Sequence, residues 1–306
     1  MPGAAHAHVG YPVKPIRLIV PFAPGGGTDI VARTLAQKLT ESFKQTVVVD
    51  NRAGGGGLVG TETAVRANPD GYTMILVSAS YGSNAALLPL TFDPVKDVIA
   101  VSVVGESCFI LGVNPSVPAR TVKELAAFAK SNPGKINYAS SGTGGVTHLA
   151  SELFDLLAGV KTTHIPYKGT GPALTDLIGG QIQMQFAPVP AILPHVKSGR
   201  VRGLGVTLAK RHSLLPDMPS VGESIAGYEA PVWYGVLGPR LLPDAIVSVW
   251  GSEISKAVQT QDMRDRMSAE GIERADTSSK YFTSTINRDV AKWKRVVREA
   301  NIKGVQ

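Results

Sequence analysis

Four junctions rich in glycine or hydroxyl residues, each between an apolar strand pattern and a helical pattern, constrain the fold of this chain most strongly. They are APGGGTD, RAGGGG, SASYGSN and SSGTGGVT, at residues 23–29, 52–57, 78–84 and 140–147. Residues 16–22, before the first junction, have the composition of a buried strand. Residues 28–43, after it, carry apolar residues at helical spacing. Strands that alternate with helices predict parallel sheets, because parallel neighbours need crossover helices.

The alternation forms two series followed by a helical tail. The expected strands lie at residues 16–22, 46–51 and 72–78 in the first series and at 135–140, 161–167, 181–187 and 201–207 in the second. A last apolar strand at 230–239 precedes helices only, and such a tail commonly packs on the first unit. We therefore predict an α/β protein with two doubly wound sheets and a ligand cleft between them, crossed by two hinge strands. The predicted domains are residues 12–112 plus 236–306, and residues 113–235.

Cofactor motifs lack the context that would support them. The chain contains no Gly-Lys-Ser/Thr and therefore no phosphate-binding loop of an NTPase. Gly55, Gly57 and Gly60 match the dinucleotide pattern G-x-G-x-x-G, but the next strand ends at Ser78 without the acidic residue that binds the ribose. The six histidines show no zinc-binding spacing, and Cys108 is the only cysteine. We expect no cofactor and no metal.

The charge of the chain is dispersed. The formal net charge is +7 over 306 residues, and the one basic run, residues 291–298, fits the solvated face of a C-terminal helix. Nucleic-acid binders usually gather Lys and Arg on one face, with aromatic residues between them. We therefore expect no nucleic-acid partner, although a mild positive field favours small anions.

Catalytic groups are scarce in the four junctions. Asp29 is their only carboxylic acid, and its spacing from Arg33 favours an i,i+4 ion pair over a catalytic acid. His148 begins a helix and could donate a hydrogen bond to a ligand or merely bond to the backbone; both interpretations stay open. Helix N-termini and hydroxyls bind anions, but they do little chemistry without a base or nucleophile. The sequence thus favours a binding protein over an enzyme.

Five segments in order resemble one family. They are YPVKPIRLIVPFAPGGGTDIVAR, VVVDNRAGGGGLVGTETAVRANPDGYTM, INYASSGTGGVTHLASELF, HIPYKGTGPALTDLIGGQIQMQF and LPDMPSVGESIAGYEAPVWYGVLGP. Together they resemble the periplasmic solute receptors of tripartite tricarboxylate transporters, the Bug receptors, from about Tyr11 to the C-terminus. The resemblance implies a type II-like two-domain periplasmic-binding-protein fold that closes over a small carboxylate without a cofactor. It also implies export to the periplasm, with the signal peptide absent from this sequence, and membrane-embedded transporter subunits as partners; we expect the receptor itself to be a monomer.

The resemblance also indicates the binding residues. The first junction is similar to the family's loop for a ligand carboxylate, and the fourth is similar to the loop that binds the other end of the ligand. The glycines of the first junction would let a carboxylate approach the backbone closely. The predicted ligand-binding residues are Phe22, Ala23, Gly25, Gly26, Thr28, Ser78, Ser80, Ser140, Ser141, Thr143, Gly144, Thr147, His148, Phe186 and Ala187.

One departure from the family bears on the ligand. Many members carry an acid at the position of Ala187, where it would suit a ligand amine, so its absence here argues against an amino acid. With Phe22 and Phe186 nearby in sequence, a dicarboxylate with an apolar body, such as terephthalate, would fit; the alternative is that both phenylalanines belong to the core. The leading hypothesis is a receptor that delivers a dicarboxylate to a transporter. A sensory receptor for the same ligand, and an enzyme of small-acid metabolism, are the alternatives.

Overall fold

The computed structural model describes residues 10–299 and 302 of the chain. The strands within these residues are β1 (Ile16–Val20), β2 (Val47–Asn51), β3 (Thr73–Ser78), β4 (Val98–Val113), β5 (Asn137–Ser140), β6 (Thr163–Pro166), β7 (Met184–Pro188), β8 (Arg202–Val206) and β9 (Pro231–Pro239). The helices are α1 (Gly27–Phe43), α2 (Leu58–Val65), α3 (Ser80–Leu87), α4 (Val122–Ser131), α5 (Val146–Ala158), α6 (Thr170–Ile178), α7 (Val189–Lys197), α8 (Asp244–Gln259), α9 (Gln261–Ala269) and α10 (Ser279–Glu299). Single 3-10 turns, η1 (Gly55–Gly57) and η2 (Val221–Glu223), complete the described elements.

The strands form one mixed sheet with two parallel units. Its order is β2-β1-β3-β9-β4-β7-β5-β6, and β8 pairs with β4. β2, β1 and β3 are parallel neighbours in the first unit, and β6, β5 and β7 are parallel neighbours in the second. The predicted alternation of strands and helices is therefore confirmed, whereas β4 and β9 add antiparallel pairing between the units that the alternation did not indicate.

β4 is a single strand of 16 residues that belongs to both units. Its first part, Val98 to Cys108, pairs with β9, and its last part, Phe109 to Val113, pairs with β7. The two units are thus joined by a hydrogen-bonded strand rather than by a loop. The predicted domain boundaries stay a prediction.

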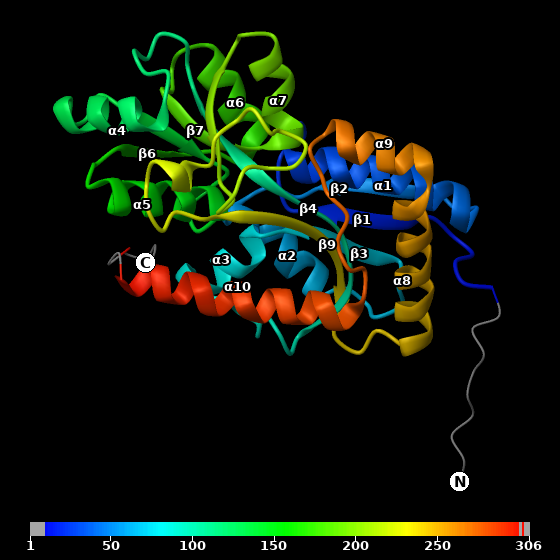
Figure 1. Ribbon diagram of the computed structural model, residues 1–306. Coiled ribbons are helices and arrows are strands. Elements are labelled where there is room, and N and C mark those ends of the chain that lie inside the picture. Colours follow the sequence, from blue (N-terminus) through cyan, green and yellow to red (C-terminus); the bar gives the residue numbers. More distant parts are fainter. Residues whose placement is uncertain (1–9, 300–301, 303–306) are drawn as a thin grey trace.

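Helices cover both faces of each unit (Figure 1). α8 packs against α1 and β4, and α10 packs along α3 and reaches α5 of the second unit. The tail is fixed by aromatic pairs: Trp250 of α8 meets Phe43 edge-on at 5.3 Å between ring centroids, and Trp233 of β9 meets Phe282 of α10 at 5.2 Å. The expectation that the helical tail packs on the first unit is confirmed. Among residues 10–299 and 302, no helix is long and apolar enough to cross a membrane.

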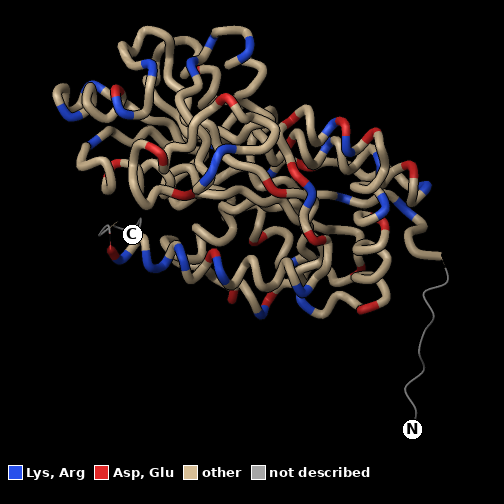
Figure 2. Tube along the Cα trace, viewed as in Figure 1, with Lys and Arg blue, Asp and Glu red and all other residues tan. Residues whose placement is uncertain are grey.

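Charged side chains are spread over both units. Figure 2 shows Lys and Arg interspersed with Asp and Glu along the Cα trace of both units. In the basic run on α10, Lys294, Arg295 and Arg298 are exposed. This agrees with the solvated helix face that the sequence predicts.

Candidate functional site

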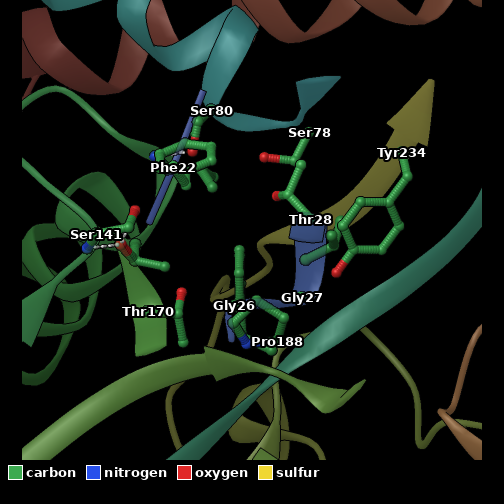
Figure 3. Close-up of a pocket in the computed structure, with 14 residues that line it drawn as sticks. Phe22, Gly26, Gly27, Thr28, Ser78, Ser80, Ser141, Thr170, Pro188 and Tyr234 are labelled. Carbon is green, nitrogen blue, oxygen red and sulfur yellow. Dashed lines mark hydrogen bonds between the residues drawn. The ribbon is translucent and has the colours of Figure 1, made fainter. Parts of the chain in front are cut away.

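The carboxyl ends of the parallel strands meet at one cavity between the two units. β1 and β3 lead into α1 and α3 from one side, and β5 and β7 lead into α5 and α7 from the other. The free volume of this cavity is about 20 Å³, little more than one water molecule requires. It is lined by Phe22, Gly26, Gly27, Thr28, Ser78, Ser80, Phe109, Ser141, Val146, Thr147, Thr170, Pro188, Val232 and Tyr234 (Figure 3).

Seven of the predicted residues line this cavity together. Six come from three of the four junctions and one, Phe22, directly precedes the first junction; the seven are Phe22, Gly26, Thr28, Ser78, Ser80, Ser141 and Thr147. The other eight predicted residues lie outside the lining, and they are Ala23, Gly25, Ser140, Thr143, Gly144, His148, Phe186 and Ala187. The sequence therefore located the cavity correctly, whereas a ligand-binding role for any of these residues stays a prediction.

Three of the residues outside the lining support the loops instead. The amide of Ala23 donates to the carbonyl of Lys168 at 2.9 Å, and the amide of Gly25 donates to Asp29 Oδ2 at 3.0 Å. Ser140 Oγ accepts from the amide of Gly142 at 3.1 Å and lies 2.6 Å from a ring nitrogen of His164. These contacts fix the shape of the two loops that flank the cavity.

Phe186 and Ala187 belong to the hydrophobic core. Both side chains are fully buried, and Phe186 stacks on Tyr228 with ring centroids 5.6 Å apart. Phe154 meets Phe186 edge-on at 6.1 Å. The core alternative is therefore correct for Phe186, and it is Pro188, one residue beyond Ala187, that lines the cavity.

Sequence reasoning missed seven lining residues: Gly27, Phe109, Val146, Thr170, Pro188, Val232 and Tyr234. Gly27 and Val146 belong to junctions that were recognised, and Thr170 begins a helix after the strand β6, so its position alone could have indicated it. Phe109, Val232 and Tyr234 project from β4 and β9. Residues 108–113 of β4 and residues 231–239 of β9 are runs without a charged or strongly polar residue, so no alternation marks which of their faces meets the cavity.

The N-termini of α1 and α5 open onto the cavity from opposite sides. Gly26 caps α1 and Gly145 caps α5, and neither cap supplies a side-chain hydrogen bond. The first amides of a helix have no acceptor within the helix and carry a partial positive charge. Helix N-termini of this kind are suited to anions, although in this structure the first amide of α5, that of Val146, donates to Ser80 Oγ.

Asp29 is fully engaged by its neighbours. Its carboxylate accepts hydrogen bonds from Arg33 Nε at 3.0 Å, from Asn51 Nδ2 at 3.0 Å and from the amide of Gly25. Burial opposes its ionisation, but these donors outweigh burial and hold the pKa of Asp29 below its ordinary value. The predicted ion pair with Arg33 is confirmed, and it fixes the loop before α1.

The two walls of the cavity touch each other. The amide of Val146 donates to Ser80 Oγ at 3.1 Å, and Ser83 Oγ donates to the carbonyl of Gly144 at 2.8 Å. A methyl group on Gly171 would lie 2.4 Å from the carbonyl oxygen of Pro24. The cleft is therefore closed in this structure, because backbone from the first unit lies against backbone from the second.

The glycines of the first junction are explained by contacts with the protein itself. A methyl group on Gly26 would meet Thr170 at 3.4 Å, and one on Gly27 would lie 2.6 Å from Pro188 and 2.7 Å from the hydroxyl of Tyr234. The expected close approach is thus made by side chains from the opposite wall and from β9. Because Gly26 and Gly27 have no Cβ, the two walls of the cavity can come into contact.

His148 bonds to the backbone. Its Nδ1 accepts from the amide of Gly144 at 3.3 Å, and its ring stacks on His164 with centroids 4.1 Å apart. Burial lowers the pKa of His148 to about 4, and burial together with His148 lowers that of His164 to about 4. The interpretation of His148 as a backbone-bonded histidine therefore agrees with the structure.

Lowering the pH should destabilise the folded protein, because His148 binds a proton more readily in the unfolded chain. The unfolded chain binds a proton at His148 below pH about 6.5, whereas the folded protein does not until about pH 4, so stability present above pH 6.5 is lost as the pH falls between these values. We expect the free energy of unfolding, measured with urea, to decrease between pH 7 and pH 4.5. The decrease should be about 2–3 kcal/mol larger for the wild type than for His148→Gln. Comparison with the variant cancels the opposite contribution of Asp155, whose pKa burial raises to about 6. An equal loss in both proteins would contradict the prediction.

A two-unit α/β fold with a cavity between two helix N-termini, and with no charged side chain among the described lining residues, fits a solute-binding protein. The model of the tripartite tricarboxylate transporter family receptor matches residues 31–302. The protein BugT of Bordetella pertussis is 35% identical over 297 residues, which are 96% of this chain and 91% of that protein. The chain therefore belongs to the receptors of the tripartite tricarboxylate transporter family.

Solved structures agree over almost the whole chain. The periplasmic binding protein BugD has a TM-score of 0.93 at 31% identity, with 96% of this chain and 100% of that chain covered. A protein of R. palustris solved with adipate has a TM-score of 0.92 at 31% identity, with the same coverage. The predicted family and the two-domain periplasmic-binding fold are confirmed. The neighbours are solute-binding receptors, so this chain is a receptor and not an enzyme.

Proposed function

We propose that this receptor acts in the periplasm, captures a small dicarboxylate with an apolar body by closure of the two units, and delivers it to a membrane-embedded transporter. Terephthalate is the aromatic candidate that we name, and adipate, which the R. palustris neighbour holds, is the aliphatic one. Family membership supports the transporter as partner.

One observation carries the proposal: the N-termini of two helices, whose own cap residues supply no side-chain acceptor, face a cavity whose described lining includes no charged side chain. Carboxylates bind readily at such termini, where amides and hydroxyls can donate to them. One carboxylate would lie at α1 and the other at α5. Phe22, Phe109, Pro188 and Val232 supply apolar surface for the body between them.

The same lining disfavours an amine on the ligand. A buried ammonium group requires a carboxylate or several acceptors, because desolvation of an unpaired charge is costly. No acidic side chain is among the described residues of the lining. An amino acid is therefore disfavoured by the whole lining, whereas Ala187 is buried in the core and does not contribute to it.

Binding must be accompanied by opening. A cavity of about 20 Å³ cannot admit a dicarboxylate, which is far larger than one water molecule. The contacts between Ser80 and Val146, and between Ser83 and Gly144, would break as the units separate. The units would then close over the ligand around a cavity larger than this one.

A thermal-shift panel tests the proposal. It compares succinate, adipate, citrate, glutamate, nicotinate, benzoate and terephthalate on the purified protein. A ligand at 100 times its Kd adds about 2.7 kcal/mol to the free energy of unfolding and raises Tm by several degrees. We expect a rise with adipate or terephthalate and none with glutamate, and NMR should show the ligand chemically unchanged after incubation.

The controls separate the parts of the proposal. Benzoate has the ring and one carboxylate, so it tests whether the second carboxylate matters. A rise with glutamate alone would contradict the uncharged-site argument. A panel in which no dicarboxylate raises Tm would overturn the ligand class while the family assignment stands.

A further inference from the structure

Tyr234 of β9 has a buried hydroxyl without a partner. The side chain is fully buried, and its oxygen makes no hydrogen bond to any described residue. Burial, together with the charges of Cys108 and Glu270, holds the pKa of Tyr234 well above its ordinary value. The hydroxyl therefore keeps its proton and is a donor that lacks an acceptor.

The other fully buried tyrosines, Tyr228 and Tyr138, have hydrogen-bond acceptors within the protein. Tyr228 donates to the carbonyl of Ala150 at 3.0 Å, and Tyr138 donates to Glu152 at 2.6 Å. Buried polar groups in proteins are nearly always hydrogen-bonded, because an unmet donor costs free energy. An unpaired hydroxyl at Tyr234 thus points to an acceptor that is not part of the protein.

The position of this hydroxyl identifies where the acceptor would lie. Tyr234 pairs with Ser78 across β9 and β3, so both side chains are on the same face of the sheet, and both line the cavity. Figure 3 shows the Tyr234 hydroxyl pointing away from its strand toward Gly27 and Pro188. A methyl group on Gly27 would lie 2.7 Å from its oxygen. The hydroxyl is therefore beside the first turn of α1.

We propose that Tyr234 donates a hydrogen bond to a carboxylate oxygen of the ligand bound at the N-terminus of α1. The inference rests on the proposed function, because it requires a carboxylate ligand. It makes Tyr234 a specificity-determining residue. A ligand that presented an apolar group at this end would leave the hydroxyl unpaired, and sites built in this way reject such analogues strongly.

The test is Tyr234→Phe, which removes one oxygen and keeps the ring. Calorimetric titration with adipate and with terephthalate measures Kd, and a thermal scan without ligand measures Tm. We expect Kd to rise about 10- to 100-fold for whichever of the two probes binds, as for the loss of a hydrogen bond to a charged group. The ligand-free Tm should stay equal or increase, because an unmet buried donor has been removed.

Tyr228→Phe is the matched control. It removes a buried hydroxyl that already has its acceptor in the protein, away from the cavity lining. We expect its ligand-free Tm to fall and its Kd to match that of the wild type. This variant shows how the chain responds when a tyrosine hydroxyl with a purely structural role is lost.

Two results would overturn the inference. A Kd of Tyr234→Phe within twofold of the wild type would show that the hydroxyl does not meet the ligand, while wild-type binding of adipate or terephthalate would leave the proposed function intact. A fall in ligand-free Tm like that of Tyr228→Phe would assign Tyr234 a structural role. Failure of the wild type to bind either dicarboxylate would instead reject the proposed function, and this inference with it.

Discussion

Gly171→Ala should weaken dicarboxylate binding by about 5- to 150-fold without destabilising the protein. The new methyl group would lie 2.4 Å from the carbonyl oxygen of Pro24 when the cleft is closed. Overpacking of this kind costs about 1–3 kcal/mol, which reduces affinity about tenfold for every 1.4 kcal/mol. In the open form the clash disappears, and alanine favours the helix α6 to which the residue belongs. Calorimetric titration and a ligand-free thermal scan measure the two effects.

Gly251→Ala is the matched control for this prediction. Gly251 lies inside α8, and the nearest atom to an added methyl group is the carbonyl oxygen of Val101 at 4.0 Å. The substitution should increase the free energy of unfolding by about 1 kcal/mol and leave affinity unchanged. If Gly171→Ala behaved in the same way, the contact between Gly171 and Pro24 would not limit binding.

Phe186→Ala should cost about 3–5 kcal/mol of stability. The ring is fully buried and packs against Tyr228 and Phe154, so the substitution leaves a cavity in the core of the second unit. Urea unfolding at pH 7 measures the loss. Affinity for the dicarboxylate that binds should not change at temperatures where the variant remains folded, because Phe186 does not line the site cavity.

Phe22 provides the contrasting position. Its side chain lines the cavity, so Phe22→Leu should raise Kd, whereas Phe186→Leu should leave Kd unchanged. The two leucine variants make the same chemical change and are milder than alanine. A higher Kd for Phe186→Leu than for Phe22→Leu would contradict the placement of both residues.

Parallel strands made much of the site predictable. Glycine and serine are frequent in the junctions after β1, β3 and β5, and the carboxyl ends of parallel strands meet at one edge of a sheet. Ser78, Ser80 and Ser141 could therefore be brought together from sequence positions alone. The helix starts after these strands also indicated an anion.

The predicted and observed lining residues differ mainly where the sequence does not show which face of a strand a residue lies on. Consecutive residues of a strand point to opposite sides, so a displacement of one residue exchanges core and cavity. This is why Pro188 lines the cavity while Ala187 is buried in the core. Tyr234 was missed for a related reason: β9 is apolar on both faces, and only its pairing with Ser78 reveals which residues meet the site.

Because β4 is continuous between the two units, the free energy of ligand binding should include the cost of twisting the sheet. Its residues Phe109 to Val113 pair with β7 and its earlier residues pair with β9, with register shifts near Ala100 and Val103, so β4 passes between the units as a hydrogen-bonded strand. In the proposed receptor, opening would have to change the twist of hydrogen-bonded strands by a small amount at many residues. The measured affinity would then report the torsional stiffness of the sheet as well as the contacts with the ligand. Substitutions along β4 that never touch the ligand could tune the receptor by making that sheet easier or harder to twist.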